Sequence, residues 1–194
     1  MDDNPTAAEF WDNRYRDREA FPEKGRAPFL MESVPFLPRH SRVLDVAVGP
    51  GRNALYLASL GFDVVGIDIS RVALERCQET ARRDGLRLQT ILADLETFPL
   101  PERAFDAVLN FYFLQRDLCP ALAAALRPGG VLVFQSYTTE QRRYPWGPTR
   151  DEHLLKPGEL RALFSGLEVL VYREEIEMGE RGEKAVASLI ARRV

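Results

Sequence analysis

The residues in this sequence best suited to chemistry are two acids and the glycine-rich turn between them. Residues 49–54, GPGRNA, match the pattern G-x-G-x-x-A, which places backbone N–H groups beside a bound nucleotide. Asp45 lies before this turn in an apolar segment, where a carboxylate is costly unless it is paired or faces a cleft. Asp68 ends a second apolar segment, a position from which a carboxylate can accept both hydroxyls of a ribose. Together these residues predict a ligand that contains adenosine.

The charge of Asp45 separates the two adenosine cofactors that fit such a turn. Its carboxylate would repel the pyrophosphate of NAD and attract the ammonium and sulfonium groups of S-adenosylmethionine, which has no phosphate. Asp68 does not discriminate between them, because both cofactors carry a ribose. We therefore expect S-adenosylmethionine, with an NAD-linked oxidoreductase as the less favoured alternative.

Alternating apolar and helical segments must position this turn. The apolar run at 43–48 predicts a buried strand that enters the turn, and residues 53–60 predict a helix that Gly61 ends. The same pattern recurs with a strand at 64–68 and Ser70 as the N-cap of the next helix. Further predicted elements are a helix up to residue 85, strands at 86–92, 105–110 and 131–137, and a helix at 117–126.

The order of these elements predicts the fold class. Continuous apolar strands that alternate with helices indicate a parallel sheet covered on both faces, which is an α/β architecture. Near the C-terminus, Pro157 opens a short helix, and β-rich stretches at 167–176 and 184–191 are separated by Gly179 and Gly182. This spacing predicts an antiparallel hairpin.

The N-terminal segment carries a separate helix. Thr6 and Glu9 have the spacing of a capping box, so a helix is expected to carry Phe10, Trp11 and Tyr15. Prolines are expected to break the pattern after it, at positions 22, 28, 35 and 38. The expected organisation is one domain, 1–194, with an N-terminal helix and lead-in at 1–40 and a sheet core with a C-terminal hairpin at 41–194.

The composition argues against several classes of function. With 26 Lys and Arg against 29 Asp and Glu, the formal net charge is −3, which does not favour nucleic acid as a partner. The two cysteines, Cys77 and Cys119, are too few for a disulfide framework or a zinc site, so no metal is expected. No apolar run approaches the roughly 18 residues of a membrane span, and no signal-like start is present. We therefore expect a cytoplasmic protein without a membrane partner.

Three motifs in order make the chain resemble the class I S-adenosylmethionine-dependent methyltransferases. They are VLDVAVGPG at 43–51, VVGID at 64–68 and LRPGG at 126–130. The resemblance implies a single-domain, Rossmann-like, doubly wound and mostly parallel sheet of seven strands, in the order 3-2-1-4-5-7-6 with strand 7 antiparallel. More narrowly, the chain looks like the tellurite-resistance and thiopurine-type methyltransferase group in WDNRY at 11–15, GRNA at 51–54 and KPGEL at 156–160.

The resemblance also implies which residues hold the cofactor. The methionine part would meet Asp45, Ala47, Gly49 and Gly51, with Asn53 in the same turn. The other implied contacts are Asp68 with the ribose, Ile69 with one adenine face, Asp94 and Leu95 with the adenine amino edge, Asn110 and Phe111 with the methionine end, and Trp11 and Tyr15 as a lid.

Several of these residues also have simpler structural interpretations. Asp45 can be a paired buried carboxylate, and Asp68 can begin a helix. Asp94 can be an ordinary loop residue, and Asn110 can form a turn. The sequence leaves both sets of roles open.

The expected reaction is in-line methyl transfer to a small acceptor, namely a thiol, a chalcogen oxyanion or a heterocycle. Such a transfer depends on alignment and on exclusion of water, so no catalytic residue needs to be assigned. Residues 110–113 lack the two prolines of amino-group methylases, which disfavours amide and nucleic-acid N-methylation. The candidate acceptor contacts are Tyr112, Arg142, Arg143 and Arg181.

Two departures from the family keep alternatives open. Ala47 stands where glycine is usual, which leaves a non-catalytic S-adenosylmethionine-binding module as an alternative function. The terminal hairpin lacks the imidazole of the tellurite group and offers only Arg181, which disfavours tellurite as the acceptor. The identity of the acceptor, the use of a general base and the oligomeric state are left open.

Overall fold

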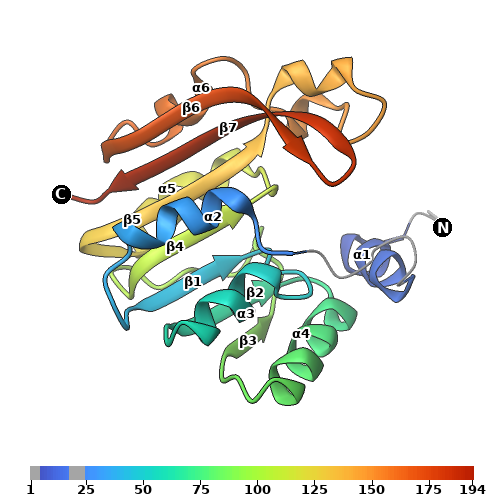
Figure 1. Cartoon of the computed structure of the whole chain (residues 1–194), viewed down its shortest axis with the longest axis vertical. Coiled ribbons are helices and arrows are strands. Elements are labelled where there is room, and N and C mark those ends of the chain that lie inside the picture. Colours follow the sequence, from blue (N-terminus) through green and yellow to red (C-terminus); the bar gives the residue numbers. More distant parts are fainter. Residues whose placement is uncertain (1–4, 18–24) are drawn as a thin grey trace.

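A seven-stranded sheet forms the central layer of the computed structural model, which describes residues 5–17 and 25–194 (Figure 1). The strand order is β3-β2-β1-β4-β5-β7-β6, and β7 is antiparallel to both of its neighbours. The predicted order and the predicted antiparallel strand are therefore confirmed. The strands are β1 (Arg42–Val46), β2 (Asp63–Asp68), β3 (Gln89–Leu92), β4 (Phe105–Phe111), β5 (Leu126–Tyr137), β6 (Glu168–Gly179) and β7 (Gly182–Arg192).

Helices cover both faces of the sheet, as Figure 1 shows. Successive residues of a strand point to opposite faces, so Val43 packs with Leu57 of α3, whereas Leu44 packs with Leu122 of α5. The first face carries α2 (Pro28–Ser33), α3 (Arg52–Ser59) and α4 (Arg71–Arg83), and the second carries α5 (Cys119–Ala125) and α6 (Glu159–Leu163). Short 3-10 helices are η1 (Val34–Phe36), η2 (Arg116–Leu118), η3 (Thr139–Arg143) and η4 (Asp151–His153).

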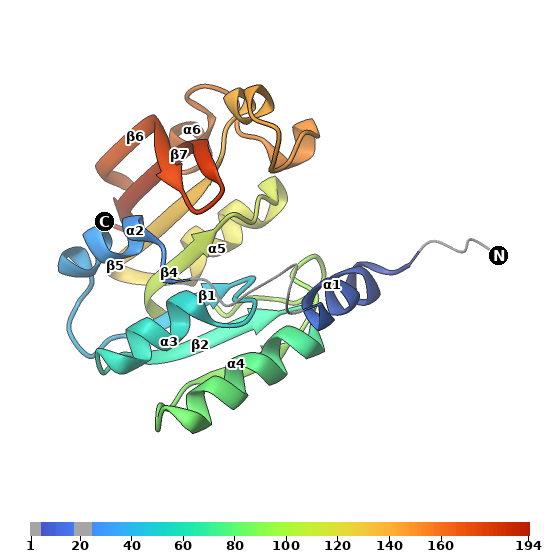
Figure 2. The ribbon, with the colours of Figure 1, turned by 45° about the vertical axis from the view of Figure 1, so that its right-hand side comes forward.

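Helix α1 (Ala7–Arg16) begins at the predicted capping box, which is confirmed. The Thr6 hydroxyl accepts from the Glu9 backbone N at 3.2 Å, and the Thr6 backbone N donates to the Glu9 carboxylate at 2.8 Å. The helix lies beside α4, at the end of the sheet where the parallel strands finish (Figure 2). Pro22, which was expected to interrupt the pattern, lies outside the described residues.

Several element boundaries differ from the predictions for identifiable reasons. β1 ends at Val46 and not at residue 48, because Ala47 adopts a left-handed φ of 50°. Pro28 starts a short helix and does not break one, since proline is suited to the first helical turn. The helix expected at 117–126 is divided into η2 and α5, and β5 begins at Leu126, ahead of the predicted residue 131.

None of the helices in the described part of the chain has the length and apolar character to span a membrane. In the same part, no cluster of three or more His, Cys, Asp or Glu side chains could hold a metal ion.

Candidate cofactor and acceptor site

The glycine-rich turn links β1 to α3 through backbone conformations that favour glycine. Gly49 has φ 55° and Gly51 has φ 87°, and Gly51 is the N-cap residue of α3. A Cβ atom on Gly51 would lie 2.3 Å from the Cys77 Sγ, so no side chain fits there. The turn therefore presents its backbone and the N-terminal end of α3 at the carboxyl edge of the sheet.

Asp68 fixes this turn to the start of α4. One carboxylate oxygen accepts from the Gly49 backbone N at 2.7 Å, and the other accepts from the Ser70 backbone N at 2.8 Å. Burial raises the pKa of Asp68, and the two backbone donors oppose that effect. A carboxylate has about four acceptor positions, so these two bonds leave capacity for ribose hydroxyls. The ribose contact of Asp68 stays a prediction. Its predicted role at the start of a helix is confirmed by the hydrogen bond with Ser70, the N-cap residue of α4.

Asp45 lies under the turn, in the interior of the sheet. Its side chain is buried, and burial raises its pKa to about 7, with Arg52 opposing the shift and Asp68 adding to it. A cation bound nearby would favour the ionised form of this carboxyl. The site is thus electrostatically suited to a positively charged ligand.

Asn110, near the end of β4, carries a buried polar atom without a partner. The residue lies beside Val46 of β1 in the parallel register and is 1% exposed. Its Oδ1 atom has no hydrogen-bond partner within the described residues. An unpaired buried acceptor costs roughly 1–3 kcal/mol, so a ligand that offers an N–H here would relieve that cost. The next residue, Phe111, is buried and packs against Phe29 at 6.5 Å between ring centroids.

The predicted adenine contacts lie together beyond the ends of β2 and β3. The Ala93 backbone N donates to the Asp68 backbone O at 3.0 Å, which brings Asp94 and Leu95 close to the ribose candidate. Asp94 accepts from the Glu96 backbone N at 2.9 Å, so it forms a turn as well. Leu95 is buried in the core, and Ile69, next to Asp68, is half-buried. Their contact with adenine remains a prediction.

Asn53 has a structural partner that the sequence did not indicate. Its Oδ1 atom accepts from the Ala27 backbone N at 3.0 Å, which ties the segment before α2 to the glycine-rich turn. Its side chain is buried, with 4% exposure. This bond places Asn53 at the turn, where it supports the surrounding structure.

Helix α1 places its aromatic residues over the turn. The Tyr15 hydroxyl lies 3.0 Å from the position of a Cβ on Gly49. Burial, followed by the charge of Asp68, raises the pKa of Tyr15 to about 12. Trp11 stacks on Tyr15 with 5.8 Å between ring centroids and remains 37% exposed. The structure thus brings both predicted lid residues to the cofactor side.

Tyr112 lies directly after Phe111 and is held by four contacts. It has a left-handed φ of 61°, a strained value for a bulky residue. Its backbone N donates to the Gln135 backbone O at 2.7 Å, and its hydroxyl donates to the Gln135 side chain at 2.7 Å. Lys184 Nζ donates to the hydroxyl at 2.5 Å, and the Arg52 guanidinium lies 5.2 Å from the ring centroid. Strained residues of this kind cluster at functional sites.

Lys184, which is buried, forms an ion pair with the partly exposed Glu177 that sequence analysis missed. Its Nζ lies 3.0 Å from the Glu177 carboxylate, directly across the hairpin in the β6–β7 register. Burial opposes the charge, but Tyr112 and Glu177 outweigh it and raise the pKa of Lys184. Gln135 closes the network by donating to Glu177 at 2.8 Å. The predicted hairpin brings Glu177 and Lys184 together, but no spacing in the sequence links them to Tyr112 or Gln135.

Two more aromatic rings extend from Tyr112 as a wall. Tyr137 lies 5.0 Å from the Tyr112 ring, and Trp146 lies 6.2 Å from the Tyr137 ring. Burial raises the pKa of Tyr137 to about 12, with a further contribution from Tyr112. The buried Gln141 holds Trp146 in place, because its Nε2 donates to the Trp146 backbone O at 2.8 Å.

The predicted arginine contacts lie on the surface around this wall. Arg142 pairs with Asp151, and Arg143 pairs with Glu140 at 2.7 Å. Arg181 is exposed at the hairpin turn and is close enough to lower the pKa of Tyr137. Their predicted role in acceptor binding would require Arg142 and Arg143 to exchange these acidic partners.

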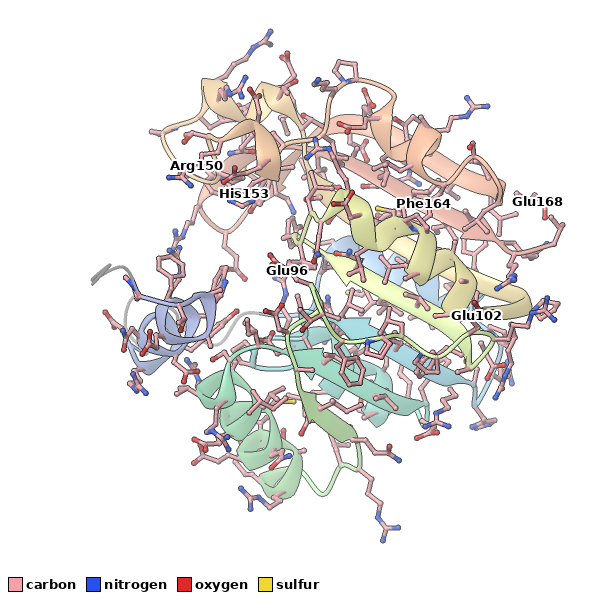
Figure 3. The ribbon with its side chains drawn as sticks, turned by 180° about the vertical axis from the view of Figure 1, so that it is seen from behind. Glu96, Glu102, Arg150, His153, Phe164 and Glu168 are labelled. Atoms are coloured by element: carbon pink, nitrogen blue, oxygen red, sulfur yellow. The ribbon has the colours of Figure 1, made fainter. Side chains whose placement is uncertain are left out.

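Figure 3 places the segment after β5 relative to the rest of the site. Arg150 and His153 lie at the end of the molecule where α1 and Glu96 lie, whereas Glu102 and Glu168 lie at the opposite end. The glycine-rich turn, α1 and this segment therefore share the carboxyl edge of the sheet, which is where open α/β sheets bind ligands.

Comparison with known proteins agrees with this geometry. A family model described as a methyltransferase domain matches residues 43–130. A probable S-adenosyl-L-methionine-dependent methyltransferase, TehB from Haemophilus influenzae, is 27% identical over 167 residues, which cover 78% of this chain and 57% of TehB. The crystal structure of that TehB aligns with a TM-score of 0.75 and 18% identity, over 95% of this chain and 67% of the other.

The chain resembles the class I S-adenosylmethionine-dependent methyltransferases in its strand order and in the methyltransferase domain matched over residues 43–130. The predicted resemblance to the TehB group is confirmed, and the matched family implies S-adenosylmethionine as the cofactor. The chain spans a little over half the length of the TehB sequence that it matches. A second relative, the tRNA 5-carboxymethoxyuridine methyltransferase of Escherichia coli, is 32% identical over 109 residues, or 52% of this chain and 41% of the relative. The structural likenesses below 25% identity show the fold.

The residues present fit this cofactor. The unpaired Asn110 Oδ1 can accept from an ammonium group, and the buried Asp45 carboxyl is suited to a cationic ligand. Asp68 retains acceptor capacity for ribose hydroxyls beside the turn.

Proposed function

We propose that this protein transfers the methyl group of S-adenosylmethionine to a small acceptor that binds beside Tyr112. The observation that carries the proposal is the unpaired, buried Oδ1 of Asn110, which lies beside Val46 at the end of β1, just before the glycine-rich turn. It joins the cofactor side, where Asp45 and Asp68 lie, to the acceptor side, where Tyr112 begins the aromatic wall.

When bound, S-adenosylmethionine supplies an electrophilic methyl group on a sulfonium. The protein has to align the cofactor with the acceptor, exclude water from the site and balance the positive charge of the cofactor. Asp68 holds the glycine-rich turn rigid through two hydrogen bonds. Asp45 provides negative charge below the turn, and Tyr15 covers the turn from outside. Alignment of this kind supplies about 7–11 kcal/mol of a reaction barrier, so no general base is assigned.

The acceptor that this site suits is small and carries a soft or anionic nucleophile. Tyr112, Tyr137 and Trp146 offer an aromatic wall, and Arg52 and Lys184 place positive charge beside it. Thiols, chalcogen oxyanions and heterocycles are small acceptors with such a nucleophile, and they suit an aromatic wall with positive charge beside it. The Escherichia coli relative acts on tRNA, but a net charge of −3 does not favour a polyanionic acceptor for this chain. The cytoplasmic location stays a prediction.

Product formation tests the proposal directly. The protein should convert S-adenosylmethionine to S-adenosylhomocysteine when it is mixed with an acceptor panel of aromatic thiols, selenite, tellurite and thiolated heterocycles, with mass detection of the methylated product. Asn110→Ala should weaken cofactor affinity, whereas Asp117→Asn, an exposed change near α5, should leave it unchanged. Tight binding of NAD in place of S-adenosylmethionine would contradict the proposal.

The alternative of a cofactor-binding module without catalysis is favoured by one observation, the left-handed Ala47 in the turn. Firm cofactor binding with no methylated product across the whole panel would favour that alternative.

A further inference from the structure

Helix α1 covers the cofactor turn without being anchored by buried side chains. None of its ten residues is buried, and Phe10 and Trp11 remain 48% and 37% exposed. A helix of this length is marginal in isolation. Polar contacts with α4 therefore hold it in position together with the half-buried Tyr15.

The first of these contacts is made by Asp12, which caps the start of α4. One carboxylate oxygen of Asp12 accepts from the Ser70 hydroxyl at 2.6 Å and from the Val72 backbone N at 3.1 Å. Ser70 is the N-cap residue of α4, and the first N–H groups of a helix have no partner within it. A negative charge at this end of a helix is also favoured by the helix dipole.

The second contact runs in the opposite direction, from α4 to α1. Arg76 lies in α4 and is 6% exposed, and its Nη1 donates to the Tyr15 backbone O at 3.0 Å. Tyr15 is in the last turn of α1, where backbone carbonyls lack helical partners. Each helix thus caps an end of the other, with an acid at an N-terminus and a base at a C-terminus.

These caps connect to the cofactor turn through a short chain of hydrogen bonds. Asp12 accepts from the Ser70 side chain, the Ser70 backbone N donates to Asp68, and Asp68 accepts from the Gly49 backbone N. Tyr15, one turn beyond Asp12, places its hydroxyl over Gly49. The position of α1 is therefore coupled to the residue that is predicted to hold the ribose.

An open space separates parts of the two helices. It has a volume of about 510 Å³, and its lining includes Tyr15, Val72, Arg16, Glu75 and Arg82. A gap of this kind limits close packing between the helices around it. The two caps are thus contacts whose loss should loosen α1.

We propose that Asp12 and Arg76 are positioning residues that latch α1 over the cofactor turn, and that opening of this latch sets the rate at which cofactor and product exchange. The inference rests on the cofactor assignment but is independent of the acceptor. It predicts that the latch acts on exchange kinetics more than on the stability of the sheet.

Dissociation of S-adenosylhomocysteine tests the latch without any acceptor. The complex is mixed with excess S-adenosylmethionine in a stopped-flow instrument, with tryptophan fluorescence or radiolabel release as the signal. Asp12→Ala should raise the dissociation rate constant about tenfold, and Asp12→Asn, which keeps one acceptor oxygen, should give a smaller increase. Asp84→Asn removes an exposed acid at the other end of α4 and serves as the charge-matched control, with no change expected.

Hydrogen exchange supplies the second measurement and guards against a folding defect. In Asp12→Ala, residues 7–16 should lose protection while the strands keep theirs, and Arg76→Met should show the same pattern. Unchanged dissociation despite lost protection of α1 would overturn the latch, and so would retained protection of α1. Failure of the wild-type protein to bind S-adenosylhomocysteine would instead contradict the cofactor assignment, so the two failures are distinguishable.

Discussion

At the residue scale, the buried carboxyl of Asp45 links cofactor affinity to pH. Burial raises its pKa to about 7, so the carboxyl is partly protonated near neutrality. Affinity for the cationic cofactor should rise several-fold between about pH 6 and pH 8, because the ionised carboxylate attracts it. Calorimetric titrations across this range check the prediction. Asp45→Asn should flatten the pH dependence, and a profile that stays equally steep in this variant would assign it to another group.

The same carboxyl should affect stability with the opposite sign. The native state holds the Asp45 proton between about pH 4 and pH 7, whereas the unfolded chain releases it. The stability that the protonated Asp45 carboxyl contributes to the ligand-free protein is therefore lost as pH rises through this window. At pH 8, Asp45→Asn should be more stable than the wild type by about 1–4 kcal/mol in urea unfolding. Asp45→Asn should therefore weaken cofactor binding while it stabilises the ligand-free fold.

A second residue-scale prediction concerns Ala47. Its φ of 50° is left-handed, which costs a non-glycine residue about 1–2 kcal/mol. Ala47→Gly removes this strain but adds freedom to the unfolded chain, so a net gain of up to about 1 kcal/mol is expected. Ala58→Gly in α3 is the control and should lose about 1 kcal/mol. Equal losses in both variants, measured by chemical denaturation, would show that the turn carries no strain at Ala47.

At this scale the sequence was informative only where chemistry is local. Gly49, Gly51 and Asp68 could be predicted, because a turn and a strand-end acid have recognisable spacing. The network of Tyr112 and Lys184 could not, since these two members lie 72 residues apart in the sequence. Only the strand order places them together.

At the element scale, the hairpin of β6 and β7 is joined to β4 and β5 by polar contacts as well as by the sheet. Lys184→Met would leave the carboxylate of Glu177, whose side chain is 21% exposed, without its cation, and a loss of about 1–3 kcal/mol is expected. The double variant with Glu177→Gln should recover part of that loss. Arg173→Met breaks the exposed pair with Glu32 and is the control, with a change within about 1 kcal/mol. Urea denaturation measures all four proteins, and an equal loss in the control would remove the special status of the pair between Lys184 and Glu177.

Element types were predicted more reliably than element ends. Ser70 and the capping box of α1 were visible because their side chains act on neighbouring backbone groups. The end of β1 was not, because it depends on the left-handed conformation of Ala47, which an alanine gives no reason to expect. The start of α5 within the helix predicted at 117–126 did have a local signal, because Pro120 lies in its first turn.

At the scale of the whole molecule, cofactor binding should stabilise the complete fold. The reason is that the glycine-rich turn joins β1 to α3 and is hydrogen-bonded to Asp68 at the end of β2. At a concentration of 100 times its Kd, S-adenosylmethionine should add about 2.7 kcal/mol, which shifts the Tm of a protein this size by about 5–10 °C. Thermal unfolding with NAD at the same concentration is the control. Equal shifts with both compounds would indicate nonspecific binding.

The global architecture was predictable because alternation of strands and helices restricts the possible sheets. The hairpin at 167–191 indicated an antiparallel edge, and the family resemblance supplied its place in the order, which the structure confirms. The relation between α1 and α4 was not predictable, since no sequence pattern joins Asp12 to Ser70.

The segment between β5 and α6 is fastened near both of its ends. Gln141 accepts from the Ala185 backbone N at 2.9 Å, and Arg116 binds Glu159 at 2.6 Å and the Leu154 backbone O at 2.9 Å. Residues 142–151 between these fastenings can therefore be exchanged as a cassette while the nucleoside end of the molecule keeps its shape. The proposed acceptor site predicts that directed evolution confined to that cassette changes the methyl acceptor.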